Sequence, residues 1–209
     1  KFEKLNGKIL SALNLAFLTY NFKYRLRTHN HEFWPDGIFS NFLTNKPKTP
    51  GRIFFLKLLK KLNNYNKTFQ KYYVIGNLSK KSNNWLKKKL KEKYIHIDLP
   101  FGEVKKLINF IKKKNIVDKS FIIITLPTPK QELIGNYLLK KLPKCSIICI
   151  GGSINILSGE EKETPNLFYF LNLEWVWRLK FDTKRRVKRL IESIYLLYKI
   201  LIYRKIDLF

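Results

Sequence analysis

The chain has 209 residues, of which 45% are hydrophobic, and a formal net charge of +27 at pH 7. This length and apolar content suffice for one buried core with an appendage. The sequence contains no run of about 18 uncharged apolar residues, so no membrane-spanning helix is predicted. The charge attracts anionic partners. Part of the lysine excess reflects a biased composition, because Lys, Asn and Ile are all abundant while Ala occurs only at Ala12 and Ala16.

The first third of the chain alternates apolar and polar segments. Ile9–Leu13 predicts a short strand, and Leu15–Arg27 predicts a helix rich in aromatic residues. A polar segment, Thr28–Asp36, then leads into a turn. Thr44–Gly51 contains two prolines and a glycine and is expected to be a loop. The apolar spacing of Ile53–Leu62 is typical of a helix.

From residue 72 onward, strands and helices are expected to alternate. The expected strands are Tyr72–Ile75, Tyr94–Leu99, Phe121–Leu126 and Ile147–Ile150. The expected helices are Trp85–Lys93, Val104–Lys114 and Leu133–Leu142. Phe121–Leu126 is apolar on both faces, which favours a central place in a parallel sheet. The alternation predicts an α/β fold with an open, mostly parallel sheet and helices on both faces, Rossmann-like in kind.

The two cysteines, Cys145 and Cys149, fall on one face of the last expected strand. Four residues at about 3.3 Å each separate them by about 13 Å, which is too far for a disulfide bond. They are expected to be reduced core residues, as in a cytoplasmic protein.

After Gly159 the pattern becomes helical, with Leu167–Leu179 and Thr183–Tyr203 as the expected helices. We therefore divide the chain into an α/β domain, residues 1–165, and a basic helical appendage at the C-terminus, residues 166–209. Five cations precede the aromatic-aliphatic end of the last helix. They are Lys184, Arg185, Arg186, Lys188 and Arg189. Such a helix is typical of a segment that lies in the interface of an anionic membrane. The alternative is a helix that packs on its own domain or on a neighbouring subunit.

Three blocks of sequence carry a family resemblance. They read P-T-P-K-Q-E (Pro127–Glu132), G-G-S-I-N-I-L-S-G (Gly151–Gly159) and L-E-W-V-W-R-L (Leu173–Leu179). The first two follow expected strands, and the carboxyl ends of parallel strands are where α/β sheets bind ligands. In order and spacing the blocks resemble the WecG/TagA/CpsF family of glycosyltransferases, over most of the chain.

The resemblance implies a reaction and its substrates. An N-acetylhexosamine, of the N-acetylmannosamine type or its uronic acid, is transferred with inversion from a UDP-sugar donor to a polyprenyl-diphosphate-linked acceptor sugar. The products serve cell-surface polysaccharide, teichoic acid or capsule synthesis in a bacterium. No cofactor or metal is expected beyond the UDP-sugar substrate. The enzyme is expected in the cytoplasm, peripheral at the inner face of the plasma membrane, and a homo-oligomer is an open alternative.

Asp36 stands in the sequence W-P-D-G-I. From these residues alone, one interpretation is turn chemistry, because Pro-Asp-Gly favours β-turns. The other is a carboxylate on a rigid loop that takes a proton from an acceptor hydroxyl. The family has an Asp-Gly-Ile/Val motif here, and the resemblance implies that Asp36 is the catalytic base.

Two further positions match the family in part. Asn14 stands where the family has T-x-N, with Ala12 in place of the Thr, and is expected to contact substrate. Its residue-level alternative is the N-cap of the following helix. Arg52 matches the Arg of R-x-x-G, which in the family helps to hold the donor diphosphate, while Phe55 replaces the Gly. The alternative for Arg52 is a solvated surface side chain.

The loops after the last two expected strands supply the remaining candidates. Lys130, Gln131 and Glu132 match the family's P-K-Q-E, with Gln131 as the expected substrate contact; capping of a helix start is the alternative. Gly151 and Gly152 let the backbone approach a ligand closely. Three replacements depart from the family. Asn155 replaces an Asp of the substrate site, Glu163 replaces an Arg, and Pro127 replaces a Gly.

Two rival functions remain. The replaced family residues are compatible with a degenerate, non-catalytic homologue. A basic nucleic-acid-binding protein is the other rival. The positive charge is spread along the chain and no recognition motif of a known binding class occurs, so we expect no specific nucleic-acid partner.

Overall fold

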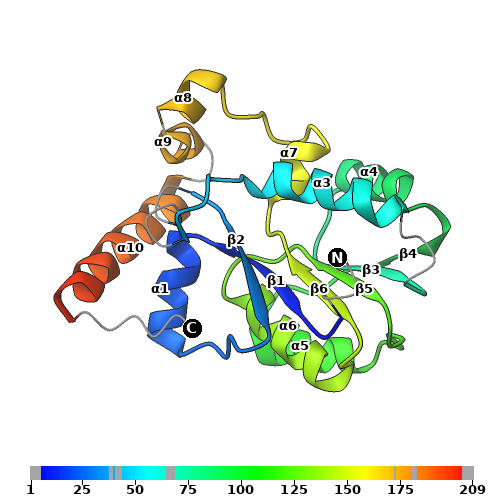
Figure 1. Cartoon of the computed structure of the whole chain (residues 1–209). Coiled ribbons are helices and arrows are strands. Elements are labelled where there is room, and N and C mark those ends of the chain that lie inside the picture. Colours follow the sequence, from blue (N-terminus) through cyan, green and yellow to red (C-terminus); the bar gives the residue numbers. More distant parts are fainter. Residues whose placement is uncertain are drawn as a thin grey trace.

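The computed structural model describes residues 6–37, 40, 44–64, 69–171, 173–179 and 183–203 (Figure 1). A six-stranded sheet in the order β2-β1-β6-β5-β3-β4 forms its centre, and every pair of neighbouring strands is parallel. The strands are β1 (Ile9–Leu13), β2 (His31–Pro35), β3 (Tyr72–Ile75), β4 (Tyr94–Ile97), β5 (Phe121–Ile124) and β6 (Ser146–Cys149). The expected open parallel sheet is confirmed.

Helices cover both faces of this sheet (Figure 1). On one face lie α3 (Gly51–Asn64), α4 (Lys80–Leu90) and α7 (Ser153–Leu157); on the other lie α5 (Val104–Lys112) and α6 (Lys130–Lys141). Each face has its own apolar cluster, because side chains along a strand point alternately to opposite faces. In β5, Phe121 and Ile123 belong to the first cluster, while Ile122 and Ile124 belong to the second. All four are 0% exposed, which confirms the central position expected for this strand.

The segment after α1 (Leu15–Tyr24) differs from the expectation. Thr28–Asp36 was expected to be a polar connection, but His31–Pro35 form β2, which pairs with β1 at the edge of the sheet. The reason lies in His31, a polar residue that is satisfied inside the fold. Its Nδ1 lies 2.9 Å from the Ser11 hydroxyl and its Nε2 lies 3.2 Å from Asn136 Oδ1. Burial lowers the pKa of His31 to about 4, so the imidazole is neutral there.

The appendage is helical, as expected, but its first part is broken. α8 (Asn166–Phe170) and α9 (Glu174–Leu179) replace the single helix expected at Leu167–Leu179, and α10 (Thr183–Tyr203) has the expected bounds. α10 lies beside α1 (Figure 1). No helix in the described ranges is long and apolar enough to cross a membrane. Cys145 and Cys149 are buried free thiols.

Candidate active site

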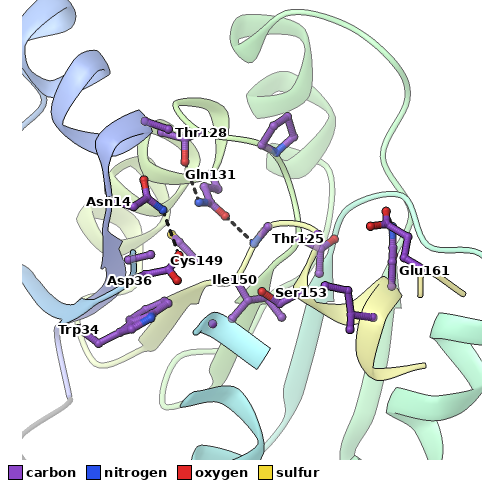
Figure 2. Close-up of a pocket in the computed structure, with 18 of the residues that line it drawn as sticks. Asn14, Trp34, Asp36, Thr125, Thr128, Gln131, Cys149, Ile150, Ser153 and Glu161 are labelled. Atoms are coloured by element: carbon purple, nitrogen blue, oxygen red, sulfur yellow. Dashed lines mark hydrogen bonds between the residues drawn. The ribbon is translucent and has the colours of Figure 1, made fainter. Parts of the chain in front are cut away.

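A cavity of about 520 Å³ lies at the carboxyl ends of the strands, and we call it the strand-end cavity (Figure 2). The residue after each of three strands lines it: Asn14 after β1, Asp36 after β2 and Thr125 after β5. Gly151 lines it from the loop after β6. Its volume falls within the range of about 300–1,000 Å³ that is usual for small-molecule sites. The sequence placed most of its candidates after expected strands and Asp36 in a turn. The sheet brings six of them together around one cavity: Asn14, Asp36, Gln131, Gly151, Gly152 and Asn155.

Asp36 and Asn14 form a pair on one side of the strand-end cavity (Figure 2). The Asn14 side-chain amide donates to Asp36 Oδ2 at 3.2 Å. Its Oδ1 accepts from the Phe17 N–H at 3.0 Å, which caps α1. The Asp36 N–H donates to the Leu13 carbonyl at 3.1 Å and extends the pairing of β2 with β1 by one residue. Asn14 is therefore both a helix cap and an orienting partner of the Asp36 carboxylate.

Gln131 links α6 to the loop after β6. Its amide NH₂ donates to Thr128 Oγ1 at 3.1 Å and to Glu132 Oε1 at 2.9 Å, and its Oε1 accepts the Gly151 N–H at 3.0 Å. Gly151 has φ +53°, a left-handed conformation that favours glycine. Gln131 is 4% exposed and lines the strand-end cavity while its polar atoms hold the surrounding backbone.

The structure places Lys130 and Glu132 away from the lining of the strand-end cavity. Lys130 Nζ donates to the Gly102 carbonyl at 2.7 Å, in the loop before α5. Glu132 is 1% exposed and accepts from the Thr128 hydroxyl at 3.0 Å. Burial raises the pKa of Glu132, and its hydrogen bonds from Gln131 and Thr128 oppose that rise. These two side chains support the loop around Gln131.

Several cavity residues carried no signal in the sequence. Glu161 lies on the side opposite Asp36 and accepts from the Asn155 amide at 3.3 Å (Figure 2). Leu190 and Ser193 reach the strand-end cavity from α10, so the appendage forms part of its wall. They could not be found from local pattern, because the pairing of α10 with α1 joins segments more than 150 residues apart.

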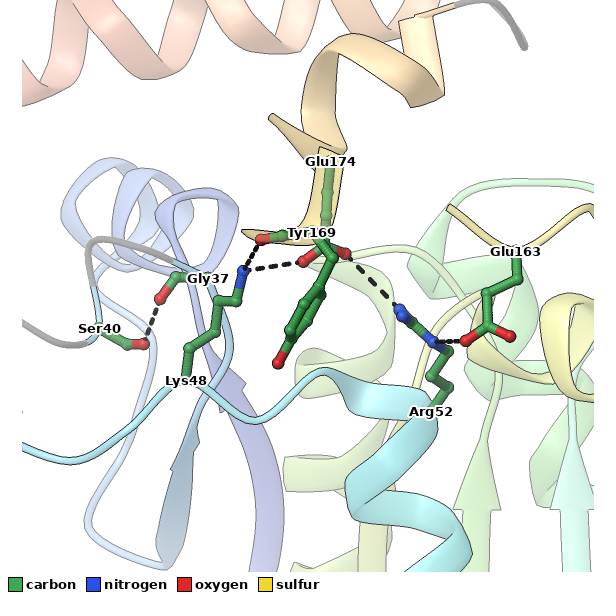
Figure 3. A network of polar contacts seen from close by, with 7 residues as sticks. All are labelled: Gly37, Ser40, Lys48, Arg52, Glu163, Tyr169 and Glu174. Carbon is green, nitrogen blue, oxygen red and sulfur yellow. Dashed lines mark hydrogen bonds and ion pairs between the residues drawn. The ribbon is translucent and has the colours of Figure 1, made fainter. Parts of the chain in front are cut away.

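Arg52 lies outside the lining of the strand-end cavity, in a network of ion pairs (Figure 3). Its side chain is 7% exposed, so it is no solvated surface arginine. Nε donates to Glu163 at 2.6 Å, and Nη1 lies 3.6 Å from Glu174 Oε2. Lys48 Nζ contacts the other oxygen of Glu174 at 3.0 Å. Glu163, which replaces a family arginine, thus gives Arg52 a carboxylate partner, and Glu174 ties α9 to α3.

Two other departures from the family have visible structural roles. Phe55, in place of a glycine, is 0% exposed and fills the apolar cluster between α3 and the sheet. Pro127, also in place of a glycine, lines the strand-end cavity. Across the described part of the chain, no three His, Cys, Asp or Glu side chains gather in a way that could hold a metal ion.

Of the five cations at the start of α10, Lys188 is exposed. The side chains of Lys184, Arg185, Arg186 and Arg189 lie outside the described part of the structure, although their backbone belongs to α10. Further along the helix, Ser193 is 6% exposed on the α1 side, where it accepts from the Thr19 hydroxyl at 3.5 Å. One face of α10 thus packs on α1, as in the alternative in which this helix packs on its own domain and does not lie in a membrane interface.

The fold and the strand-end cavity define an α/β protein with a cavity at the carboxyl ends of its parallel strands, where the Asn14 amide donates to the Asp36 carboxylate. The model of the glycosyl transferase WecG/TagA/CpsF family matches residues 34–207, and the chain belongs to this family. It is similar to the N-acetylglucosaminyldiphosphoundecaprenol N-acetyl-beta-D-mannosaminyltransferases of Staphylococcus aureus strains COL and MRSA252, with 29% identity over 90 residues in each. That alignment covers 43% of this chain and 35% of each relative, about a third of their length.

Proposed function

We propose that this protein transfers an N-acetylhexosamine from a UDP donor to a sugar on a polyprenyl-diphosphate carrier. The transferred sugar is N-acetylmannosamine or its uronic acid, and the product serves the synthesis of a bacterial cell-surface polysaccharide. The observation that carries the proposal is the Asp36 carboxylate, held by Asn14 at the edge of the strand-end cavity. Family membership supports a glycosyl transfer, and the names of the relatives support this sugar and this kind of carrier.

In the proposed reaction, the oxygen of the acceptor hydroxyl attacks the anomeric carbon of the donor, and Asp36 accepts the proton of that hydroxyl. The bond from that carbon to the diphosphate breaks on the opposite side, its electron pair leaves with UDP, and the anomeric configuration inverts. Asn14 keeps the carboxylate oxygen directed at the acceptor through the 3.2 Å bond. Gln131 holds the Gly151 peptide, which shapes the floor beneath the substrates.

Arg52 has a different part in this proposal from the one its motif implies. Both of its partners are carboxylates: Glu163 accepts from Nε at 2.6 Å, and Glu174 forms an ion pair with Nη1 at 3.6 Å. Displacing them with a diphosphate would exchange one set of ion pairs for another and gain little. Arg52 therefore acts by fixing α9 beside α3, at one remove from the donor.

α10 supports a contact with an anionic membrane at the inner face of the plasma membrane. Five apolar side chains of this helix are between 53% and 62% exposed: Ile191, Ile194, Tyr195, Tyr198 and Ile202. At about 100° per residue they fall on a single stripe, turned away from the buried Ser193. Lys188 is exposed one turn ahead of this stripe. An apolar stripe with cations beside it is the pattern of a helix that lies in a membrane interface.

A donor screen tests the proposal. The purified full chain is given UDP-N-acetylmannosamine, its uronic acid, UDP-N-acetylglucosamine and UDP-glucose, with a soluble sugar-diphosphate acceptor analogue. We expect transfer from one of the N-acetylmannosamine-type donors and release of UDP in equal amount. UDP-sugar binding without transfer would instead favour the degenerate homologue.

A further inference from the structure

A second cavity, of about 340 Å³, lies between α1 and α10, and we call it the α1–α10 groove. Its walls are aromatic, formed by Tyr20 and Phe22 of α1 and Tyr195 of α10, and its charged residues are Lys23, Lys199 and Glu192. The groove exceeds the smallest usual ligand sites, which begin at about 300 Å³. Its composition suits an apolar chain that carries an anionic group at one end.

The α1–α10 groove continues the line of the strand-end cavity. Ala16 lines the strand-end cavity, while Tyr20 and Lys23, one and two turns further along the same side of α1, line the groove. Seven residues of helix from Ala16 to Lys23 span about 10 Å. The boundary between the two spaces is the contact of Thr19 with Ser193, because Ser193 lines the strand-end cavity and Thr19 lines the groove.

Two lysines and one glutamate line the groove, so its charge favours a single anionic group. Lys199 Nζ lies 4.7 Å from the Tyr195 ring, and Lys23 Nζ lies 5.3 Å from the ring of Tyr24 next to it. The Lys199 ammonium thus stands beside an aromatic wall of the groove, and the Lys23 ammonium beside a ring outside its lining. Glu192 lines the groove itself and repels a second anionic group there. A nucleotide is therefore a poor occupant, and an uncharged hydrocarbon chain is a good one.

We propose that the α1–α10 groove binds the first isoprene units of the polyprenyl chain of the acceptor. The acceptor sugar then lies in the strand-end cavity, and the diphosphate passes over the contact of Thr19 with Ser193 that separates the two spaces. This inference rests on the proposed function, since it takes the lipid-linked acceptor as given.

Equilibrium binding to the full chain tests the groove without need of turnover. Two acceptor analogues share one sugar diphosphate; one ends in a methyl group and the other in three isoprene units. Each buried methylene contributes about 0.8 kcal/mol, so we expect the isoprenyl analogue to bind at least tenfold more tightly. Tyr195→Ala should lower that preference roughly three- to tenfold and leave binding of the methyl analogue unchanged. Tyr195 is 56% exposed, so the substitution spares the core.

Tyr198→Ala is the matched control, since Tyr198 is 62% exposed on the same helix and lies outside the groove. Equal isoprenyl preference in the Tyr195→Ala variant and the parent would overturn the inference. An equal loss of preference in both variants would also overturn it, because it would indicate general contact with the apolar stripe. So would a parent protein that binds the two analogues equally well. Transfer from the UDP-sugar to the methyl analogue is measured separately; its absence would contradict the proposed function and leave the binding result to decide on the groove.

Discussion

The two walls of the strand-end cavity are held in place in different ways. The sheet wall rests on parallel pairing of β1 with β2 and β6, and on side chains such as Ile9 and Ile147, which are both 0% exposed. The wall made by α10 rests on α1, with Ser193 against Thr19, while Ile191 and Tyr198 on its far side are each 62% exposed. Burying such a side chain fully gains about 1.5–3 kcal/mol. The sheet wall is thus packed on both of its sides, whereas the appendage wall is packed against α1 on one side and keeps apolar side chains exposed on the other.

The largest expected effect lies on the sheet wall. Asp36→Asn keeps the size of the side chain and removes its ability to accept a proton. We expect turnover to fall by roughly 10²–10⁴-fold, because that is the usual contribution of a general base. Steady-state transfer with a soluble acceptor measures it, and vesicle binding and the unfolding midpoint should stay at the parent values. Turnover retained in this variant would contradict the role of Asp36 as base.

The next effect separates the appendage wall from the sheet wall. A chain that ends at Lys180 lacks α10, its cations and its apolar stripe. Each cation near an anionic leaflet contributes about 1 kcal/mol, so affinity for anionic vesicles should fall on the order of 10²–10³-fold. Sedimentation with vesicles measures it. Ile191→Ser with Tyr198→Ser in the full chain is the gentler control and should weaken binding in part. Pelleting that survives both the truncation and high salt would refute the electrostatic anchor.

A pH titration tests how the edge of the sheet wall is held. The folded pKa of His31 is about 4 against an ordinary value of 6.5, so between these values the unfolded state binds the extra proton. The free energy of unfolding should therefore decrease as pH falls from about 6.5 toward 4, by on the order of 3 kcal/mol, and this group should add no slope above that window. Denaturant unfolding at several pH values measures the slope. His31→Gln should flatten it, whereas the exposed His29→Gln should keep most of it, because burial is the largest cause of the lowered pKa of His31 and the charge of His29 is a smaller one.

The smallest effect concerns the ion pairs that connect α9 to Lys48 and to Arg52 of α3. Glu174→Gln removes the charge shared by Lys48 and Arg52, whose side chains are 11% and 7% exposed. Unfolding free energy should fall by roughly 1–3 kcal/mol, since two buried cations lose their carboxylate. Glu163→Gln, at a side chain 65% exposed, should cost less than about 1 kcal/mol despite its shorter contact. Equal losses in the two variants would mean that burial does not set the strength of these ion pairs.

Much of the fold could be predicted because its signals are local. β5 reads as a run of four apolar residues, and burial on both faces leaves no other reading for it. α10 has the same bounds, Thr183–Tyr203, as the helix that the sequence predicts. β2 was missed because its hydropathy is misleading: His31 enters the fold through Ser11 and Asn136, and both partners are distant in sequence.

The candidate site was predictable where it follows the strands and unpredictable where it depends on tertiary pairing. Asn14 and Gly151 follow expected strands and were found there, whereas Asp36 was found from its motif, because the strand before it, β2, was not expected. The ion pairs of Arg52 were not predictable, because its motif carries no information about Glu163 and Glu174, which are more than 100 residues away in sequence. Ser193 was missed for the same reason, since only the packing of α10 on α1 brings it to the cavity.

The diameter of α10 sets the distance between the strand-end cavity and the apolar stripe. One side of the helix lines the strand-end cavity through Ser193, and the opposite side carries the apolar stripe. A helix with its side chains is about 10–12 Å across. With the stripe resting on a leaflet, as proposed, the reacting sugar is held at about that height above the lipid surface. The helix then acts as a spacer that selects carriers whose head group projects that far, and the search for an acceptor takes place in a plane.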